Sequence, residues 1–354
     1  MIAPLEGTAL KQALRSMHEK PTSFDIAFLA GVSQPTVSRA LRGSPVVSIE
    51  TRKRIEEIAR QLNYRVDKNA SNLRSQHSNT LALLLFEDPT PDDSQINPFF
   101  LSMLGSITRA SARQGYDLLI SFQQLSRDWQ QDYEDSRKAD GIILLGYGDY
   151  EEYRPRLVRL VEQGTHFVRW GPVLEGQPGI SVGCDNLQGG YEVTRHLLSA
   201  GRKAIAFLGT ATSHYPEFFD RYRGYERAMM ESGVATSSAL QVDAITTEES
   251  GFQAAKELLS RDVAFDAIVA ASDLIAIGAL RALQEAGIDV PRQVAVVGFE
   301  DIPAASLTNP PLTTVMQDTR RAGELLVETL LSQIAGDAAA NSVIPTRLVV
   351  RRSG

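Results

Sequence analysis

Residue types that contact base edges and phosphates stand close together near the start of this chain. From residue 34 to residue 41, Val37, Ala40 and Leu41 form one face of a short helical pattern, and the other face is polar: Gln34, Thr36, Ser38 and Arg39. Amide, hydroxyl and guanidinium groups on one helix face can bind base edges and backbone phosphates. The alternative is a surface helix whose polar residues are merely solvated, and the neighbouring elements decide between the two.

Motifs for common enzyme chemistries are missing from the sequence. It has no dinucleotide fingerprint, no phosphate loop, no HExxH motif and no GxSxG motif with its partner residues. Residues 146–148, Gly-Tyr-Gly, follow a strand pattern but lack a third glycine, so they are interpreted as a loop. The lone Cys184 has no His or Cys at metal-ligand spacing, which favours a structural role. We expect no enzyme, no cofactor and no metal.

A sharp turn between two short helices positions the polar face. Gly31 can take the positive φ that the turn requires, and Ser33 is a good N-cap for a helix that begins at Gln34. Pro35 falls in the first turn of that helix, where its missing N–H leaves no bond unmade. The preceding helix has an apolar face made of Ile26, Ala27, Leu29 and Ala30. This arrangement is a helix-turn-helix, which presents its second helix to DNA.

A third amphipathic helix is predicted over residues 48–62. Its apolar positions follow helical spacing, and its first turns are basic: Ile55, Ile58, Ala59 and Leu62, with Arg52, Lys53 and Arg54. Three small helices around one core would account for the first sixty-odd residues.

Residues 22–74 resemble the DNA-binding headpiece of the LacI/GalR family of bacterial transcription regulators. The matching segments are AGVSQPTVSRAL, GSPVVSIETRKRIEEIARQLNY and NASNLRSQHSNTLALLL, and the resemblance continues through NPFF, GYDLLI, DGIILL, SDLIAIGALRAL, VAVVGFED and PPLTTV in family order. It leaves out only about the first twenty residues. The resemblance implies a regulator of gene expression that contacts DNA through Ser33, Gln34, Pro35, Thr36, Ser38 and Arg39.

A polar segment, DKNASNLRSQHS, follows the headpiece at residues 67–78. By composition it could be a plain tether. The resemblance implies instead a hinge helix that forms on the operator, pairs with its dimer mate and inserts Leu73 into the minor groove, with Asn69, Ala70 and Arg74 on the neighbouring faces. Such a wedge kinks the duplex at a cost of roughly a few kcal/mol. Val66 departs from the proline of many relatives, which leaves the stiffness of the junction open.

From Thr80 onward apolar strands alternate with amphipathic helices, which are predicted at residues 98–114, near 129–138, and at 187–200, 217–232 and 274–286. This alternation predicts parallel sheets covered on both faces. The strands are too many for one sheet, so we expect two doubly wound lobes joined by several crossovers, with a ligand beyond the carboxyl ends of the strands. The predicted fold is a helix-turn-helix domain plus a two-lobed, periplasmic-binding-protein-like α/β domain. The predicted segments are an extension of unknown role at 1–21, the DNA-binding domain at 22–66, the hinge at 67–79, and the effector-binding and dimerisation domain at 80–354.

The resemblance also implies an effector site where strands end. Its expected residues are Phe99, Phe100, Arg169, Trp170, Arg221, Thr246, Ser272 and Glu300. At these family positions, aromatic rings stack on a sugar, and Arg and carboxylate groups hold its hydroxyls. Each residue could also have a purely structural role. Phe100 and Trp170 could pack in the core, and Asp273, which follows Ser272, could cap the helix that begins after it.

Three departures from relatives bear on the identity of the effector. Glu300 stands where sugar-binding relatives commonly have Asp, and Arg169 stands where many have Asp. Either Arg169 pairs with Glu300 and shapes a site for a neutral sugar, which we prefer, or it adds to Arg221 and favours an anionic one. Thr246 replaces an aromatic residue of some relatives, which suggests a roomier pocket that could admit a disaccharide.

The charge is divided along the chain. Residues 1–80 carry 12 Lys and Arg against 7 Asp and Glu, whereas the other residues carry 24 against 36, within a net charge of −7. A basic head on an acidic body concentrates the attraction for phosphates at one end. No stretch approaches the length of a membrane span and the N-terminus is too polar for a signal peptide, so we expect a cytoplasmic protein.

The leading hypothesis is a homodimeric repressor of carbohydrate-utilisation genes that binds an inverted-repeat operator and responds to a sugar. Tetrameric family members carry a leucine-heptad tail, and here TRLVVRRSG closes the sequence without heptads, so we expect a dimer. The alternatives are a regulator controlled by a protein corepressor and a sugar-binding protein without DNA binding. The sequence does not identify the effector sugar or the operator bases, and it does not distinguish induction from corepression.

Overall fold

The computed structural model describes residues 21–64, 77–86, 96–125 and 127–354. The chain divides into two compact units, residues 1–77 and residues 78–354, and each is described by itself. The predicted hinge contacts Asn69, Ala70, Leu73 and Arg74 lie outside the described residues, as does the N-terminal extension up to residue 20.

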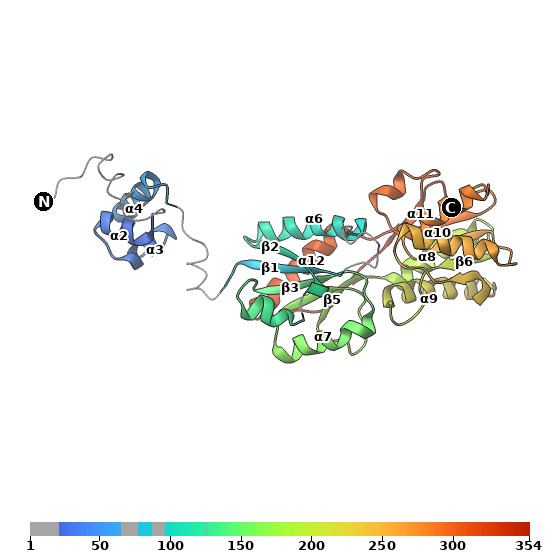
Figure 1. Ribbon diagram of the computed structural model, residues 1–354, viewed down its shortest axis with the longest axis horizontal. Coiled ribbons are helices and arrows are strands. Elements are labelled where there is room, and N and C mark those ends of the chain that lie inside the picture. Colours follow the sequence, from blue (N-terminus) through green and yellow to red (C-terminus); the bar gives the residue numbers. More distant parts are fainter. Residues whose placement is uncertain (1–20, 65–76, 87–95, 126) are drawn as a thin grey trace. The chain divides into compact units, whose positions relative to one another are not determined.

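The first unit is the predicted three-helix domain (Figure 1), made of α2 (Ser23–Ala30), α3 (Gln34–Leu41) and α4 (Ile49–Gln61). Thr22 and Asp25 cap α2 reciprocally, and Gly31 ends it with φ of 63°. The fully buried residues at the centre are Ile26, Val37 and Ile55. The helix-turn-helix prediction is confirmed, with one difference at Ser33. This residue precedes α3 but makes no capping bond, because its hydroxyl lies 2.9 Å from Thr36 Oγ1.

The second unit has two lobes, each built on a six-stranded sheet. In the first, here called the N-lobe, the strand order is β11-β5-β4-β3-β1-β2. Its elements are β1 (Thr80–Leu85), α6 (Pro98–Arg113), β2 (Asp117–Phe122), the 3-10 turn Gln123–Leu125, the π-helix Gln130–Asp135, β3 (Gly141–Leu145), α7 (Tyr150–Gln163), β4 (Phe167–Trp170), β5 (Ile180–Cys184), α12 (Thr319–Ile334) and β11 (Ser342–Ile344).

In the second lobe, the C-lobe, the strand order is β12-β10-β9-β8-β6-β7. Its elements are α8 (Asn186–Ser199), β6 (Ile205–Leu208), α9 (Pro216–Glu231), the 3-10 turn Ser238–Leu240, β7 (Gln241–Val242), α10 (Glu248–Ser260), β8 (Ala267–Ala270), α11 (Asp273–Glu285), β9 (Ala295–Glu300), the 3-10 turn Pro303–Ser306, β10 (Thr313–Met316) and β12 (Arg347–Val349). β12 pairs antiparallel with β10, and the other pairings are parallel.

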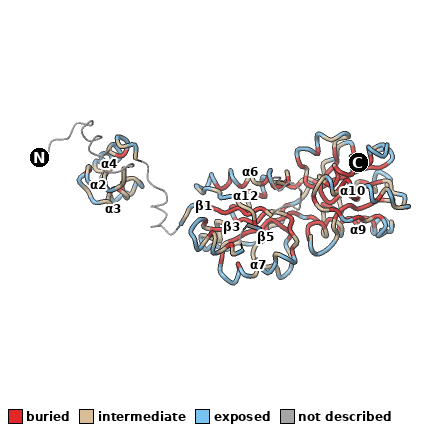
Figure 2. Tube along the Cα trace, viewed as in Figure 1, coloured by how far each residue is buried: buried red, intermediate tan, exposed pale blue. Residues whose placement is uncertain are grey.

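The strands are apolar because helices cover both faces of each sheet. In the N-lobe, Leu81 and Leu83 belong to the cluster that includes residues of α6 and α12, whereas Ala82 and Leu84 pack with residues of α7. This alternation follows the period of two of a β-strand. Figure 2 shows the buried strands inside and the exposed outer faces of the helices. The predicted pair of doubly wound lobes is confirmed, and the chain crosses between them after β5, β10 and β11.

Several elements differ from the sequence expectation. The helix expected near residues 129–138 is only the short π-helix Gln130–Asp135, while α7, α10 and α12 were not predicted. Within the described part of the chain, no helix is both long and apolar enough to cross a membrane.

Candidate functional site

A cavity of about 290 Å³ lies between the two lobes, at the carboxyl ends of their strands. Its lining comes from the segments after β1, β2, β3, β6 and β7 and from the starts of α7 and α9: Phe86, Gln124, Tyr147, Asp149, Glu152, Thr210, Tyr215, Phe218, Ile245, Thr246 and Thr247. Ligands of doubly wound folds bind at this end of the sheets. Of the eight residues expected from the sequence, Thr246 is in the lining.

Arg221 lies behind the cavity wall and is only 1% exposed. Its Nη2 donates a hydrogen bond to the Tyr147 hydroxyl at 3.2 Å, its Nε donates to Asn186 Oδ1 at 2.9 Å, and its Nη1 donates to the Ala271 carbonyl. The guanidinium also lies 4.0 Å from the centre of the Phe299 ring. Arg221 therefore orients the phenol of Tyr147, which does line the cavity.

Burial keeps that phenol neutral. It raises the pKa of Tyr147 well above its usual value, although the nearby Arg221 charge lowers it. A neutral hydroxyl that accepts a bond from Arg221 can still donate its own proton to a ligand oxygen.

The expected aromatic residues support Tyr147 and do not form the cavity surface. The centre of the Phe100 ring lies 4.7 Å from that of Tyr147 in an edge-on contact, and the Phe99 ring stacks on it at 6.2 Å. Trp170 packs on Phe99 at 6.0 Å. The three rings are at most 4% exposed. The structural explanation thus holds for Phe99, Phe100 and Trp170 in this structure, because Tyr147, on which Phe99 and Phe100 pack, lines the cavity.

Thr246 and Ser272 belong to a hydrogen-bond chain that crosses between the lobes. Asn97 Nδ2, in the N-lobe, donates to Thr246 Oγ1 at 3.1 Å, and Thr246 Oγ1 donates to Ser272 Oγ at 3.2 Å. Ser272 also caps α11, because its hydroxyl accepts from the Ile275 N–H. Ser272, and not Asp273, is therefore the N-cap of α11.

Glu300 ends β9 next to Arg221. It is 1% exposed. Burial lowers the pKa of Arg221, but the interactions with Tyr147 and with Glu300 raise it more. Glu300 and Arg221 both belong to the C-lobe, and neither is among the residues that line the cavity. The backbone at Glu300 and Asp301 has φ of 116° and 58°, a region that non-glycine residues rarely adopt.

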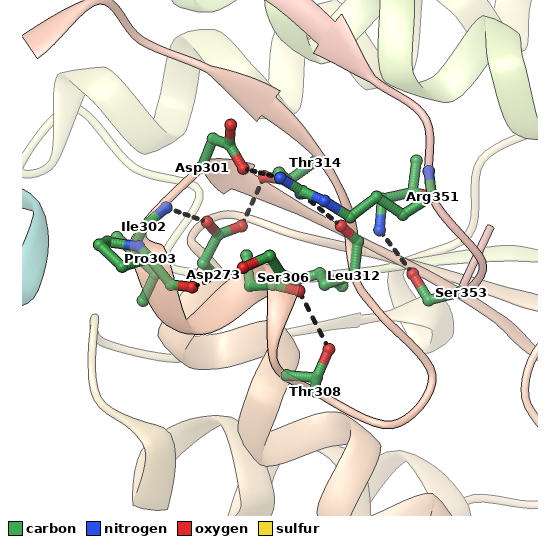
Figure 3. A network of polar contacts seen from close by, with 12 residues as sticks. Asp273, Asp301, Ile302, Pro303, Ser306, Thr308, Leu312, Thr314, Arg351 and Ser353 are labelled. Carbon is green, nitrogen blue, oxygen red and sulfur yellow. Dashed lines mark hydrogen bonds and ion pairs between the residues drawn. The ribbon is translucent and has the colours of Figure 1, made fainter.

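A buried network holds this strained turn (Figure 3). The Asp273 carboxylate accepts hydrogen bonds from the Ile302 N–H at 2.8 Å and from Thr314 Oγ1 at 2.5 Å. Arg351 binds Asp301 at 2.6 Å and so attaches the C-terminal segment to the same turn. Burial raises the pKa of Asp273 to about 7, although the bonds from Thr314 and Ile302 lower it.

Arg169 does not have the role expected of it. It is 1% exposed and absent from the cavity lining. Its Nη2 donates to the Pro172 carbonyl at 2.9 Å and to Gln177 Oε1 at 3.0 Å. Burial raises the pKa of Glu217, in α9, and the charge of Arg169 partly offsets this rise. The structure thus places Arg169 with Glu217 and not in the preferred pairing with Glu300.

On the DNA-binding unit, the outward face of α3 carries the expected residues. Ser33, Pro35 and Arg39 are exposed, and Gln34, Thr36 and Ser38 are half-buried. Gln34 Nε2 donates to Ser23 Oγ at 3.2 Å, which ties the start of α3 to α2. Arg39, in the last turn of α3, is solvent-exposed.

Most of the lining residues were not predicted from the sequence. Tyr147 was recognised only as part of a loop, and the acidic pair Asp149 and Glu152 and the aromatic pair Tyr215 and Phe218 were not singled out. A usable signal was present, because Tyr147 comes two residues after a buried strand and Phe218 falls in the first turn of the helix after β6. Side chains in such places gather at the ligand-binding end of a parallel sheet.

Family models match both units of the chain. One is described as "Bacterial regulatory proteins, lacI family" and matches residues 24–67, and the other is described as a periplasmic binding protein-like domain and matches residues 194–354. Among curated proteins, the HTH-type transcriptional regulator RegA of Clostridium saccharobutylicum is 33% identical over 311 residues, which cover 87% of this chain and 90% of the relative. The regulator CelR of Thermobifida fusca is 30% identical over 341 residues, 95% of this chain and 98% of the relative.

Solved structures of other proteins share the fold of this chain. A structure of a CelR–cellobiose complex has a TM-score of 0.70 and 30% identity, and the match covers 95% of this chain and all of that one (100%). A lac repressor dimer bound to operator shares the fold, with a TM-score of 0.81 at 24% identity over 95% of this chain and 99% of that chain. The expected class, a DNA-binding transcriptional regulator and not an enzyme, is confirmed by these relatives. The chain belongs to the LacI family of bacterial transcriptional regulators.

Proposed function

We propose that the chain is a homodimeric repressor of carbohydrate-utilisation genes that acts in the cytoplasm and is controlled by a neutral sugar bound between the lobes. The observation that carries the proposal is the composition of the cavity wall. The wall combines aromatic faces, at Tyr147, Tyr215 and Phe218, with the hydroxyls of three threonines. Aromatic faces and hydrogen-bonding groups are what a sugar ring and its hydroxyls require.

The charge of the wall favours a neutral ligand over an anionic one. Among the described lining residues, Asp149 and Glu152 are ionisable acids, and none is Lys or Arg. Arg169, on which the anionic alternative depended, is engaged at Pro172 and Gln177, away from the cavity. An anion in this cavity would face two carboxylates, whereas sugar hydroxyls can donate hydrogen bonds to them.

The size of the cavity, about 290 Å³, is close to the lower end of the ~300–1,000 Å³ that ligand pockets usually span. This supports a mono- or disaccharide. Cellobiose is present in the structure of CelR, the relative that is 30% identical along almost all of this chain, so we propose β-linked disaccharides as the first compounds to test.

On the DNA side, we propose that Arg39 and Gln34 contact bases and that Ser33, Pro35, Thr36 and Ser38 complete the surface of α3. Their exposed or half-buried positions on one helix face support this assignment. Two copies related by a two-fold axis would bind an inverted repeat. We further propose that the hinge segment at residues 67–79 contacts the minor groove through Asn69, Ala70, Leu73 and Arg74.

A thermal-shift screen of sugars, repeated with operator DNA, tests the proposal. An effector that fits it stabilises residues 78–354 and changes operator affinity in the same concentration range. The screen pairs each neutral sugar with its uronic acid or phosphate. A response only to the anionic member of a pair would exclude the neutral-sugar site, and a full set of sugars without effect would exclude sugar control.

A further inference from the structure

The segment that begins α9 in the C-lobe meets the N-lobe at a charged contact. His214 Nδ1 lies 2.8 Å from Asp149 Oδ2, and the Tyr150 N–H donates to the His214 carbonyl at 2.8 Å. The other oxygen of Asp149 accepts the N–H groups of Glu151 and Glu152 at 3.0 and 3.2 Å, which fixes the carboxylate at the start of α7. One carboxylate therefore joins a helix of the N-lobe to a loop of the C-lobe.

A second electrostatic interaction between the lobes involves Glu217, three residues further on. Glu217 is 4% exposed, and burial raises the pKa of its carboxyl group, although the charge of Arg169 on β4 of the N-lobe lowers it. Gly171 leaves room for both groups, since a Cβ there would lie 2.6 Å from Arg169 Nη1 and 3.2 Å from Glu217 Oε1. Opposite charges interact strongly in such a buried place.

These contacts are located at the edge of the effector cavity. Asp149, which binds His214, and Tyr215, which follows His214 in the chain, both line the cavity. His214 itself is exposed to solvent. When the lobes separate, the His214–Asp149 contact must break and Glu217 must move away from Arg169.

We propose that Asp149, His214, Arg169 and Glu217 form a clamp that holds the lobes closed over the cavity and weakens as the solution becomes alkaline. They are positioning residues: they set the balance between closed and open lobes. Their effect on effector release rests on the proposed function, whereas their effect on the lobes does not.

The direction of the pH effect follows from the groups that face His214, which are Asp149, Glu151 and Glu152 of α7. The hydrogen bond with Asp149 raises the pKa of His214 above its usual 6.5. Burial raises the pKa of Asp149, but the bonds from His214 and from the N–H groups of α7 lower it more, so the carboxyl ionises below its usual pH. The contact is therefore an ion pair from acidic pH up to the raised pKa of His214, and it loses its charge above that pH.

The inter-lobe distance of the full chain tests the clamp without any effector. Spin labels attached through Val161→Cys on α7 and Met230→Cys on α9 report the distance, because both side chains are exposed. The native Cys184 is buried and burial raises its thiol pKa to about 12, so it does not compete for the label. Distance distributions are compared at pH 6 and pH 8.5.

We expect the open population to rise about two- to fivefold at the higher pH, the size expected for a solvent-exposed ion pair. His214→Gln, which can still donate a hydrogen bond, should abolish this rise. The matched control is His166→Gln, because His166 pairs with Glu134 at 3.0 Å inside the N-lobe, and it should keep the wild-type rise. Glu217→Gln should increase opening at both pH values and keep the rise.

An unchanged wild-type distribution between the two pH values would overturn the clamp, as would a His214→Gln variant with the wild-type rise. The sugar screen is independent of this result. A pH-dependent clamp in a protein that ignores every sugar would contradict the proposed effector and leave the clamp in place.

Discussion

The guanidinium of Arg221 donates a hydrogen bond to the hydroxyl of Tyr147 at 3.2 Å, and this bond joins α9 of the C-lobe to the loop after β3 of the N-lobe. The other bonds of Arg221 go to Asn186 and Ala271 in the C-lobe. Tyr147 lines the cavity and Arg221 does not. A ligand that touches the phenol would therefore act on a bond that reports the relative position of the two lobes.

Tyr147→Phe should weaken the response to effector and leave operator binding intact. The variant keeps the aromatic contacts but removes a buried acceptor of Arg221, a loss worth about 1–3 kcal/mol. We expect roughly tenfold or more effector to be needed for the same change in operator affinity, measured by fluorescence anisotropy of labelled operator.

The control for this variant is Tyr225→Phe. Its hydroxyl donates to the Ile205 carbonyl at 2.7 Å inside the C-lobe. It should lower the unfolding temperature without altering the effector response. Equal responses from the two variants would mean that the Arg221–Tyr147 bond serves stability alone.

Arg39→Ala should abolish the preference for operator over random DNA. Its side chain is exposed on α3, and a bidentate contact to a base is worth about 1–3 kcal/mol of discrimination. Weak, salt-sensitive DNA binding should remain because the phosphate contacts remain. Arg60→Ala, on α4 and paired with Glu57 at 2.6 Å, is the control. Competition binding that still separates operator from random DNA as in the wild type would remove Arg39 from base recognition.

The fold could be predicted from the sequence because its signals are local. Runs such as residues 81–85 and 141–145 are apolar throughout, and helices cover them on both sides. Gly31 has the positive φ that the turn of the headpiece required. α7 was missed although Asp149 caps it, because its sequence contains Pro155, which is unusual inside a helix.

The site was harder to predict because its residues come from distant segments of the chain on two different lobes. Sequence pattern located Arg169 at a strand end but could not tell that the loop at Pro172 and Gln177 would bind its guanidinium. The same limit hid Tyr147, whose importance comes from Arg221 on the other lobe. Thr246 was found because family position alone placed it in the cavity.

Thr246→Trp should exclude larger sugars from the cavity. Thr246 is in the lining, and an indole there would occupy much of the 290 Å³ volume. We expect disaccharide binding to fall at least tenfold, with a smaller effect on monosaccharides, measured by calorimetry. Thr246→Val is the control, since it removes the bonds to Asn97 and Ser272 at nearly constant volume. If both variants lose disaccharide equally, those bonds, and not space, determine affinity.

Asp273→Asn should flatten the pH dependence of stability. Burial raises the pKa of Asp273 from 3.8 to about 7, so between these pH values the folded protein holds a proton that the unfolded chain releases. The free energy of unfolding therefore falls as pH rises through this range, by on the order of 2 kcal/mol between pH 5 and pH 7. Thermal unfolding from pH 5 to pH 8 should show this loss in the wild type and a smaller one in the variant.

Asp266→Asn is the matched control, because Asp266 accepts backbone N–H bonds from Lys203 and Ala204 in the same lobe, and it should keep the wild-type slope. A wild-type slope in Asp273→Asn would mean that the carboxyl is ionised in the folded protein, held by the Thr314 and Ile302 bonds that support the turn at Glu300.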